Sequence, residues 1–232
     1  VGLAVLKLSA GENYRESAPV ETAFLLMAGS VTASVANRNV KLARVSLFDD
    51  GPSCIHLAAG AELKLGAESS AEFTVYRTGN RKRFEPRIFL PADTADEQRG
   101  KGQVGGACLR LVRTIFDRNN SDLNAELVLG EVVTLPGRWS SYPPHHHPQP
   151  EIYHYRVDPP QGYGHAELGD AGSHHGHPCR FGRRHFLPVI RPVFRCRAAS
   201  VIGREHEGGP ALVGGQRLQR VPHPREEPIG AP

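Results

Sequence analysis

The chain contains the segment GRWSSYPPHHHPQPEIYHYRVDPPQGYGHAEL between Gly137 and Leu168, and three consecutive histidines stand near its middle. Successive side chains of an extended strand point to opposite faces, so His145 and His147 share one face and His146 points to the other. Two imidazoles on one face of a strand make half of a metal site. The segment therefore predicts a β-strand that presents a pair of metal ligands.

The residues after the histidines predict a turn into a second strand. Gln149 lies between two prolines, which favour such a turn. A strand from Glu151 to Val157 can then return antiparallel and bring the carboxylate of Glu151 against the imidazoles. Two neutral imidazoles and one carboxylate form a ligand set with which a catalytic divalent ion keeps a position open for water or substrate. The alternative is a solvated histidine-rich loop that captures metal without a specific function.

The spacing of these ligands, His-x-His followed after three residues by Glu, is the first metal motif of the cupin barrels. The whole stretch resembles the 5-deoxy-glucuronate isomerase family of inositol catabolism, which belongs to the cupin superfamily. Three segments carry the resemblance: Trp139 to His145, Glu151 to Tyr153, and Pro159 to Gly162. It covers about residues 1–168 and is strongest from Arg110 onward.

The resemblance implies a metal-dependent isomerase that turns an aldose into a ketose. In the family, 5-deoxy-D-glucuronate becomes 2-deoxy-5-keto-D-gluconate. His145, His147 and Glu151 would hold a divalent metal, zinc or manganese, which stabilises the charge that develops during proton transfer. The family completes its metal site with a histidine from a second motif, and we identify no equivalent of that histidine in this sequence.

The resemblance also suggests residues that contact the sugar-acid substrate. Tyr153 and Tyr155 have the parity of Glu151 and would point into the barrel as hydrogen-bonding residues, with plain core packing as the alternative. Gln161 matches the Pro-Pro-Gln-Gly turn of the family and would contact substrate or only shape the turn. Arg113 falls in a family-like segment and could meet an acidic substrate, although a surface or inter-domain salt bridge is its more ordinary role. The general base is not identified.

The N-terminal part predicts an all-β fold. Residues 1–90 form short alternating runs broken at Gly, Asn, Asp and Ser, which is typical of an antiparallel barrel or sandwich. This barrel has no metal motif, and a lone strand histidine such as His56 is expected to be structural. Residues 91–106 are polar and glycine-rich and predict a linker, and residues 107–168 predict the metal-bearing part of a second barrel. The expected architecture is a bicupin, two β-barrel or jelly-roll halves, with the second barrel incomplete.

The composition of the chain changes after Leu168. Of the 64 residues from 169 to 232, 34 are Gly, Pro, Arg or His, and Lys is absent. These residues predict an irregular tail outside any packed core, because they cannot bury enough apolar area to offset the cost of ordering the chain. Such a composition is typical of an out-of-frame reading of a GC-rich gene, and a natural disordered tail is the alternative.

The charge distribution separates the body of the chain from this tail. Residues 1–168 carry 18 Lys and Arg against 19 Asp and Glu, whereas residues 169–232 carry 10 Arg against 5 acids. The basic pI of about 9.0 belongs to the tail, so the body gives no reason to expect nucleic acid as a partner. No run of 18 apolar residues occurs, so no membrane partner is expected. Four scattered cysteines predict a reduced, cytoplasmic protein.

The sequence leaves several functions open. The first is the isomerase described above, which would act on a small sugar acid. A homo-oligomer is a possible form of this enzyme. The alternatives are the 4-deoxy-L-threo-5-hexosulose-uronate ketol-isomerase of pectin breakdown, a non-catalytic sugar-binding cupin, and an inactive frameshifted product.

Overall fold

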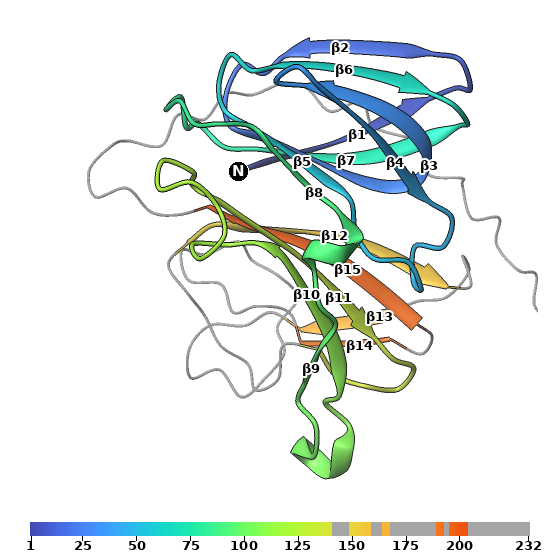
Figure 1. Cartoon of the computed structure of the whole chain (residues 1–232). Coiled ribbons are helices and arrows are strands. Elements are labelled where there is room, and N and C mark those ends of the chain that lie inside the picture. Colours follow the sequence, from blue (N-terminus) through green and yellow to red (C-terminus); the bar gives the residue numbers. More distant parts are fainter. Residues whose placement is uncertain (141–148, 159–163, 168–188, 193–194, 204–232) are drawn as a thin grey trace, which may run out of the picture.

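The structure is a computed structural model, and it describes residues 1–140, 149–158, 164–167, 189–192 and 195–203. Over these residues the chain is built of β-strands and two short 3-10 helices, arranged in two units that pack against each other (Figure 1). The predicted all-β class is therefore confirmed. In the same part of the chain no helix is long and apolar enough to cross a membrane.

The first unit is an eight-stranded sheet that follows the alternating runs of the sequence. Hydrogen bonds connect β1, β7, β3, β5 and β8 in that order, while β6 and β4 pair with the other part of β3 and β2 pairs with β6. The strands of this unit are β1 (Gly2–Leu8), β2 (Asn13–Ser17), β3 (Thr22–Val35), β4 (Arg38–Arg44), β5 (Cys54–Leu57), β6 (Glu62–Ala67), β7 (Ala71–Arg77) and β8 (Arg87–Phe89).

The long strand β3 belongs to both halves of this sheet. Its first part pairs with β7 and β5, and its second part, from Gly29 onward, pairs with β4 and β6. Gly29 follows a register shift in the pairing with β7 and has a φ of +98°. A Cβ at Gly29 would lie 2.3 Å from the Ser70 carbonyl oxygen. A side chain is therefore excluded there both by the backbone conformation and by the neighbouring segment.

An apolar core fills the interior of the first unit. The rings of Phe24 and Phe73 meet edge to face with centroids 6.4 Å apart, and Tyr14 packs against Phe24 in the same way. Leu63 and Leu65 of β6 point into this core and are at most 1% exposed. The interior of this barrel is therefore occupied by side chains, which agrees with the absence of a metal motif from its sequence.

The second unit consists of a five-stranded sheet in the order β12-β15-β11-β10-β9 and a two-stranded sheet of β13 and β14. The segment predicted as a linker, residues 91–106, contributes one strand to it, because β9 pairs with β10. The elements are η1 (Pro91–Asp93), β9 (Glu97–Arg99), η2 (Gln103–Gly106), β10 (Arg110–Phe116), β11 (Leu127–Thr134), β12 (Glu151–Asp158), β13 (Gly164–Glu167), β14 (Val189–Pro192) and β15 (Arg195–Gly203).

Two of these strands lie in the segment whose composition predicts an irregular tail. β14 pairs with β13, and β15 pairs along its length with both β11 and β12. The prediction of irregular structure is therefore wrong for residues 189–192 and 195–203. Composition misleads here because β15 is a central strand, whose backbone groups are paired on both sides and whose sequence needs no alternation of apolar and polar residues.

A second apolar core lies between the two units. The first unit contributes Ala23, Leu25 and Met27 of β3, whose neighbours Phe24 and Leu26 face the barrel interior. Because both faces of this part of β3 are buried, its sequence TAFLLM is almost continuously apolar. The second unit contributes the buried side chains of Ile115, Phe116, Leu127 and Leu129.

The carboxylate of Glu21 ties the first unit to the second inside this interface. It accepts hydrogen bonds from the backbone N–H groups of Glu126 at 2.8 Å and Leu127 at 2.9 Å. It also accepts one from the Asn80 side chain at 2.7 Å and pairs with His56 Nε2 at 2.8 Å. Burial acts to raise the pKa of Glu21, but the hydrogen bonds, first that of His56, outweigh it and hold the pKa below its usual 4.5. The structural role expected for His56 is thus confirmed.

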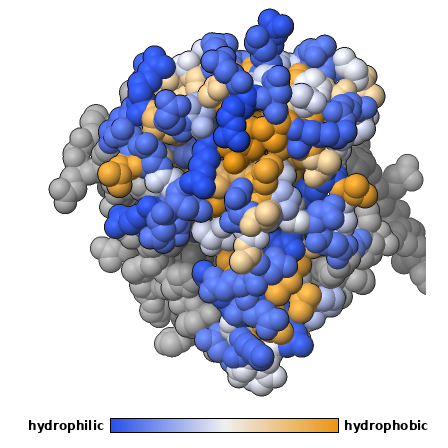
Figure 2. All heavy atoms as spheres, in the orientation of Figure 1, coloured by the Kyte–Doolittle hydropathy of each residue, from blue (hydrophilic) through white to orange (hydrophobic). Residues whose placement is uncertain are grey.

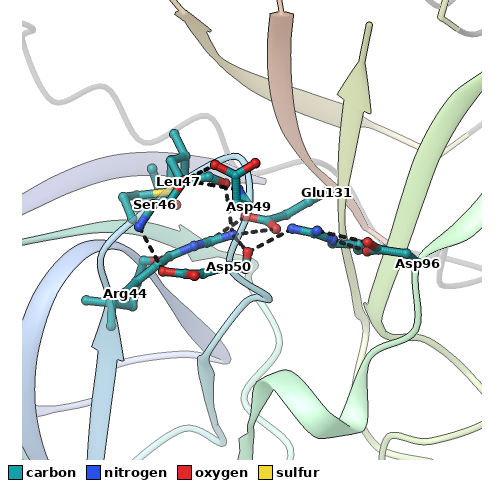
Figure 3. A network of polar contacts seen from close by, with 11 residues as sticks. Arg44, Ser46, Leu47, Asp49, Asp50, Asp96 and Glu131 are labelled. Carbon is teal, nitrogen blue, oxygen red and sulfur yellow. Dashed lines mark hydrogen bonds and ion pairs between the residues drawn. The ribbon is translucent and has the colours of Figure 1, made fainter.

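A buried ion pair crosses the same interface, as Figure 3 shows. Arg44 of β4 donates to both carboxylate oxygens of Glu131 of β11, at 2.9 Å each, and neither side chain is exposed to solvent. Arg44 also donates to the carbonyl oxygens of Leu26 at 2.9 Å and Asp50 at 3.1 Å. From the other unit, Arg113 donates to the same Asp50 carbonyl at 2.8 Å. Burial raises the pKa of Glu131, and Arg44 opposes that shift.

Removing one partner of this pair is expected to destabilise the protein strongly. Arg44→Met leaves the Glu131 carboxylate buried without its counter-charge, and we expect the free energy of unfolding in urea to fall by about 3 to 5 kcal/mol. The double variant Arg44→Met/Glu131→Leu should recover much of that loss, because no buried charge remains. A double variant as unstable as Arg44→Met would contradict this expectation, because removal of the second charge would then have recovered nothing.

Acid is expected to weaken the interface through Glu21. Because its pKa is lower in the folded protein than in the unfolded chain, its contribution is present in full above the usual pKa of 4.5 and is lost as pH falls through the folded value. Urea unfolding measured between neutral pH and about pH 3 should show this loss in the wild type and a weaker pH dependence in Glu21→Gln. The exposed Glu62→Gln serves as the control and should keep the wild-type dependence.

Candidate functional site

The two faces of β12 have different surroundings. Ile152 packs against the apolar core between the units, and Nη2 of Arg156 pairs with Glu72 of β7 in the first unit. The even-numbered side chains of β12 therefore face the first unit. Because side chains alternate along a strand, Glu151, Tyr153 and Tyr155 lie on the opposite face of β12.

The same face continues across the sheet to β11. β15 lies between the two strands, and its register places Tyr153 level with Gly130 and Tyr155 level with Val132. Directly opposed residues of paired strands share a face, which agrees with the burial of Leu129 and Glu131 on the other face of β11. Gly130 carries no side chain, and a Cβ there would lie 3.1 Å from the Arg113 carbonyl oxygen.

The two tyrosines predicted to contact substrate lie side by side. Their rings stack with centroids 5.7 Å apart and planes 11° from parallel. Tyr155 is 38% exposed, so its ring is not enclosed in a core. The structure therefore brings both phenol groups together on the face that carries Glu151, as the strand parity predicts.

Three further predicted residues fall in segments that the structure leaves undescribed. His145 and His147, the proposed metal ligands, lie outside the described residues, as does His146. Gln161 also lies outside them. Glu151 is the predicted ligand whose position is described, half-buried at the first residue of β12. Among the described residues alone, no group of three side chains could hold a metal ion.

Arg113 is engaged in an ion pair, the alternative considered for it. The side chain is 4% exposed; Nε contacts one carboxylate oxygen of Asp96, and Nη2 donates to the other at 3.0 Å. Arg113 also donates to the Asp50 carbonyl oxygen, so its side chain connects β10 of the second unit to the first unit. A contact between Arg113 and substrate stays a prediction, and it would require the guanidinium to share or leave Asp96.

Sequence reasoning gave no role to His154, which lies next to the predicted site. Its register places it level with Glu131, on the face toward the first unit and away from Glu151. Its Nε2 is buried and has no hydrogen-bond partner in the described part of the chain, and burial, followed by the nearby Arg156, lowers its pKa. His154 is therefore a neutral interface residue and does not belong to the ligand set of Glu151. Strand parity alone could have assigned His154 to the face opposite its neighbours Tyr153 and Tyr155.

Comparison with known proteins places this geometry in a family. The profile of the KduI/IolB family matches residues 1–176. Proteins named 5-deoxy-glucuronate isomerase from Bacillus velezensis and Shouchella clausii are each 28% identical, over 176 and 177 residues. Each match covers 70% of this chain and 63% of the relative, so the chain spans less than two thirds of those proteins.

Solved structures share the fold. An IolB-like protein from Salmonella typhimurium superposes with a TM-score of 0.71 at 23% identity, over 87% of this chain and 82% of that chain. A putative glyoxylate-induced protein from Pseudomonas aeruginosa superposes with a TM-score of 0.60 at 12% identity, over 90% and 76% of the two chains. The predicted bicupin architecture is thereby confirmed, and the incompleteness of its second barrel stays a prediction. Because the family profile extends over most of the sequence, the chain belongs to the KduI/IolB family.

Proposed function

We propose that this chain is a metal-dependent aldose-ketose isomerase that converts 5-deoxy-D-glucuronate to 2-deoxy-5-keto-D-gluconate. The observation that carries the proposal is the common face of Glu151, Tyr153 and Tyr155 on β12, which begins four residues after the last of the three histidines. The names of the curated relatives support the same activity.

The donor set suits a divalent cation. Imidazole nitrogen from His145 and His147 and carboxylate oxygen from Glu151 are ligands that zinc and manganese accept. Glu151 is half-buried and lies on the face of β12 that turns away from the first unit. When bound, the ion would supply electrophilic stabilisation of the negative charge that develops as a proton leaves C2 of the sugar.

The chain's own side chains would orient the sugar acid beside that position. The phenol groups of Tyr153 and Tyr155 can donate hydrogen bonds to substrate oxygens or accept them from its hydroxyls. Their stacked rings restrict each other's rotation, so both hydroxyls are held in place before substrate arrives. Gln161 follows β12 by three residues and would contribute an amide to the same face. Cys54 and Cys108 are free and buried, which supports the proposed cytoplasmic location.

Turnover assays test the proposal directly. The purified chain, loaded with zinc or manganese, is expected to isomerise 5-deoxy-D-glucuronate, with product followed by NMR. Tyr153→Phe should lower kcat/KM by about tenfold or more, since one hydrogen bond to a charged or developing-charge group is lost. The ketol-isomerase alternative would instead show turnover of 4-deoxy-L-threo-5-hexosulose-uronate alone. Binding of the sugar acid without turnover would identify a non-catalytic cupin.

Metal analysis tests the ligand assignment independently of turnover. His145→Ala and His147→Ala are expected to abolish stoichiometric binding of zinc or manganese, as measured by elemental analysis after gel filtration. His146→Ala is the matched control and should keep nearly the wild-type metal content, because alternation directs His146 to the other face. Equal loss in all three variants would indicate a flexible histidine loop and contradict the strand-borne site.

A further inference from the structure

The outer face of the first unit carries a row of polar side chains that the isomerase function does not use. Leu63 and Leu65 of β6 point into the core, so Lys64 between them points outward. In the register of the sheet, Lys64 stands opposite Arg15 of β2 on one side and Ser34 of β3 on the other. The four strands of this row, β2, β6, β3 and β4, lie together at the top of Figure 1.

Two cations of this row have no counter-charge. Arg15 and Lys64 are both exposed, and within the described part of the chain neither makes an ion pair or a side-chain hydrogen bond. Like charges directly opposite each other on paired strands destabilise a sheet. Hydrophilic residues cover much of the face drawn in Figure 2. Other exposed cations of the first unit, such as Lys41, which pairs with Glu68, do have a carboxylate partner. An anion bound beside Lys64 would relieve this repulsion.

A cleft of about 620 Å³ begins at this row and runs to the loops at the end of the barrel. Its lining includes Ser34 and Lys64 from the row and Arg83 and Phe84 from a loop. The guanidinium of Arg83 covers Gly60, where a Cβ would lie 2.3 Å from Nη1. The Arg83 backbone is fixed in turn by Asn124, whose Nδ2 donates to its carbonyl oxygen at 3.0 Å.

Arg83 therefore presents a second cation to the cleft, and among the described residues its guanidinium has no ion-pair partner. Gly60 has a φ of +76° and lies in a tight turn, closed by a bond from the Ala61 N–H to the Ala58 carbonyl oxygen. The turn is held to the body of the barrel, because the Gly60 N–H donates to the Ala18 carbonyl oxygen at 2.6 Å. The surface on which the guanidinium rests is thus rigid.

The neutral groups of the cleft indicate which kind of anion it would accept. Ser34 Oγ donates to Asn39 Oδ1 at 2.5 Å, so these two residues offer a ligand the Asn39 NH2 group and the lone pairs of the Ser34 hydroxyl. The half-buried ring of Phe84, 4.9 Å from that of His56, gives an apolar wall. The carboxylate of Glu62 also lines the cleft, where it can accept hydrogen bonds from hydroxyls and repels polyanions. We propose that this cleft binds a sugar acid with a single carboxylate, which Lys64 and Arg83 would pair while the neutral groups bind its hydroxyls. This site lies in the barrel without a metal motif and does not depend on the proposed isomerase activity.

Calorimetry with D-glucuronate tests the proposal. The full chain is dialysed against EDTA at low ionic strength, so that the proposed metal site cannot contribute, and is titrated with D-glucuronate, D-glucose or inorganic phosphate. We expect D-glucuronate to bind, and we expect its affinity to fall as salt is added. D-Glucose, which lacks the carboxylate, should bind at least about tenfold more weakly. Phosphate should also be weaker, because it cannot use the hydroxyl-binding groups.

Variants locate the binding. Arg83→Ala and Lys64→Ala should each weaken D-glucuronate binding about tenfold, and Arg83→Lys should lose less, because it keeps the charge. Arg81→Ala is the matched control. Arg81 is exposed, belongs to the same basic run and does not line the cleft, so this variant should bind D-glucuronate with the affinity of the wild type. Glu151→Gln should also bind normally, which separates this site from the proposed metal site. Equal affinities for glucuronate and glucose, tighter binding of phosphate, or unchanged binding in both Arg83→Ala and Lys64→Ala would overturn the proposal.

Discussion

The bidentate pair between Arg44 and Glu131 joins the two units at a point from which water is excluded. Transfer of two charges from water to such a place is costly, and the cost is offset only where the remaining donors are also satisfied. Here the carbonyl oxygens of Leu26, Leu47 and Asp50 accept from the Nη groups of the same guanidinium, while Nε has no hydrogen-bond partner among the described residues. The pair therefore depends on a specific arrangement of both units, which a shift of either one would break.

This pair also determines which way β11 faces. A strand that slips by one residue exchanges its two faces, and such a slip would move Glu131 away from Arg44 and leave both charges buried and unpaired. With Glu131 directed to the first unit, Gly130 and Val132 are directed to the other side of the sheet. β15 transfers this choice of face to β12, where Glu151, Tyr153 and Tyr155 share the side of Gly130. The orientation of the candidate site is thus linked to an ion pair on the opposite face.

Strand parity and local pattern were sufficient to predict most strands of the first unit, β11, and the common face of Glu151 with the two tyrosines, but they gave no sign of β2 or β8. They could not predict contacts between residues far apart in the chain. Arg44 and Glu131 are separated by 87 positions, and nothing near either residue marks it as buried. For Arg113 an ion pair was considered as the more ordinary role, but its partner, Asp96, was not predicted. The strand at 195–203 was missed because its arginines and small residues resemble a solvated segment, whereas its backbone is paired with two neighbours.

The position of β15 also has a consequence for the order in which the protein is made. β11 and β12 follow each other in the sequence but do not pair; the strand that joins them comes from residues 195–203. During synthesis the sheet of the N-terminal barrel can form as soon as β8 has left the ribosome, since every strand that pairs within this sheet is then available. The sheet that carries Glu151 has a gap until the much later β15 arrives and closes a long loop, which is a slow, non-local step. The surface proposed for chemistry is therefore the last part of this sheet to be assembled.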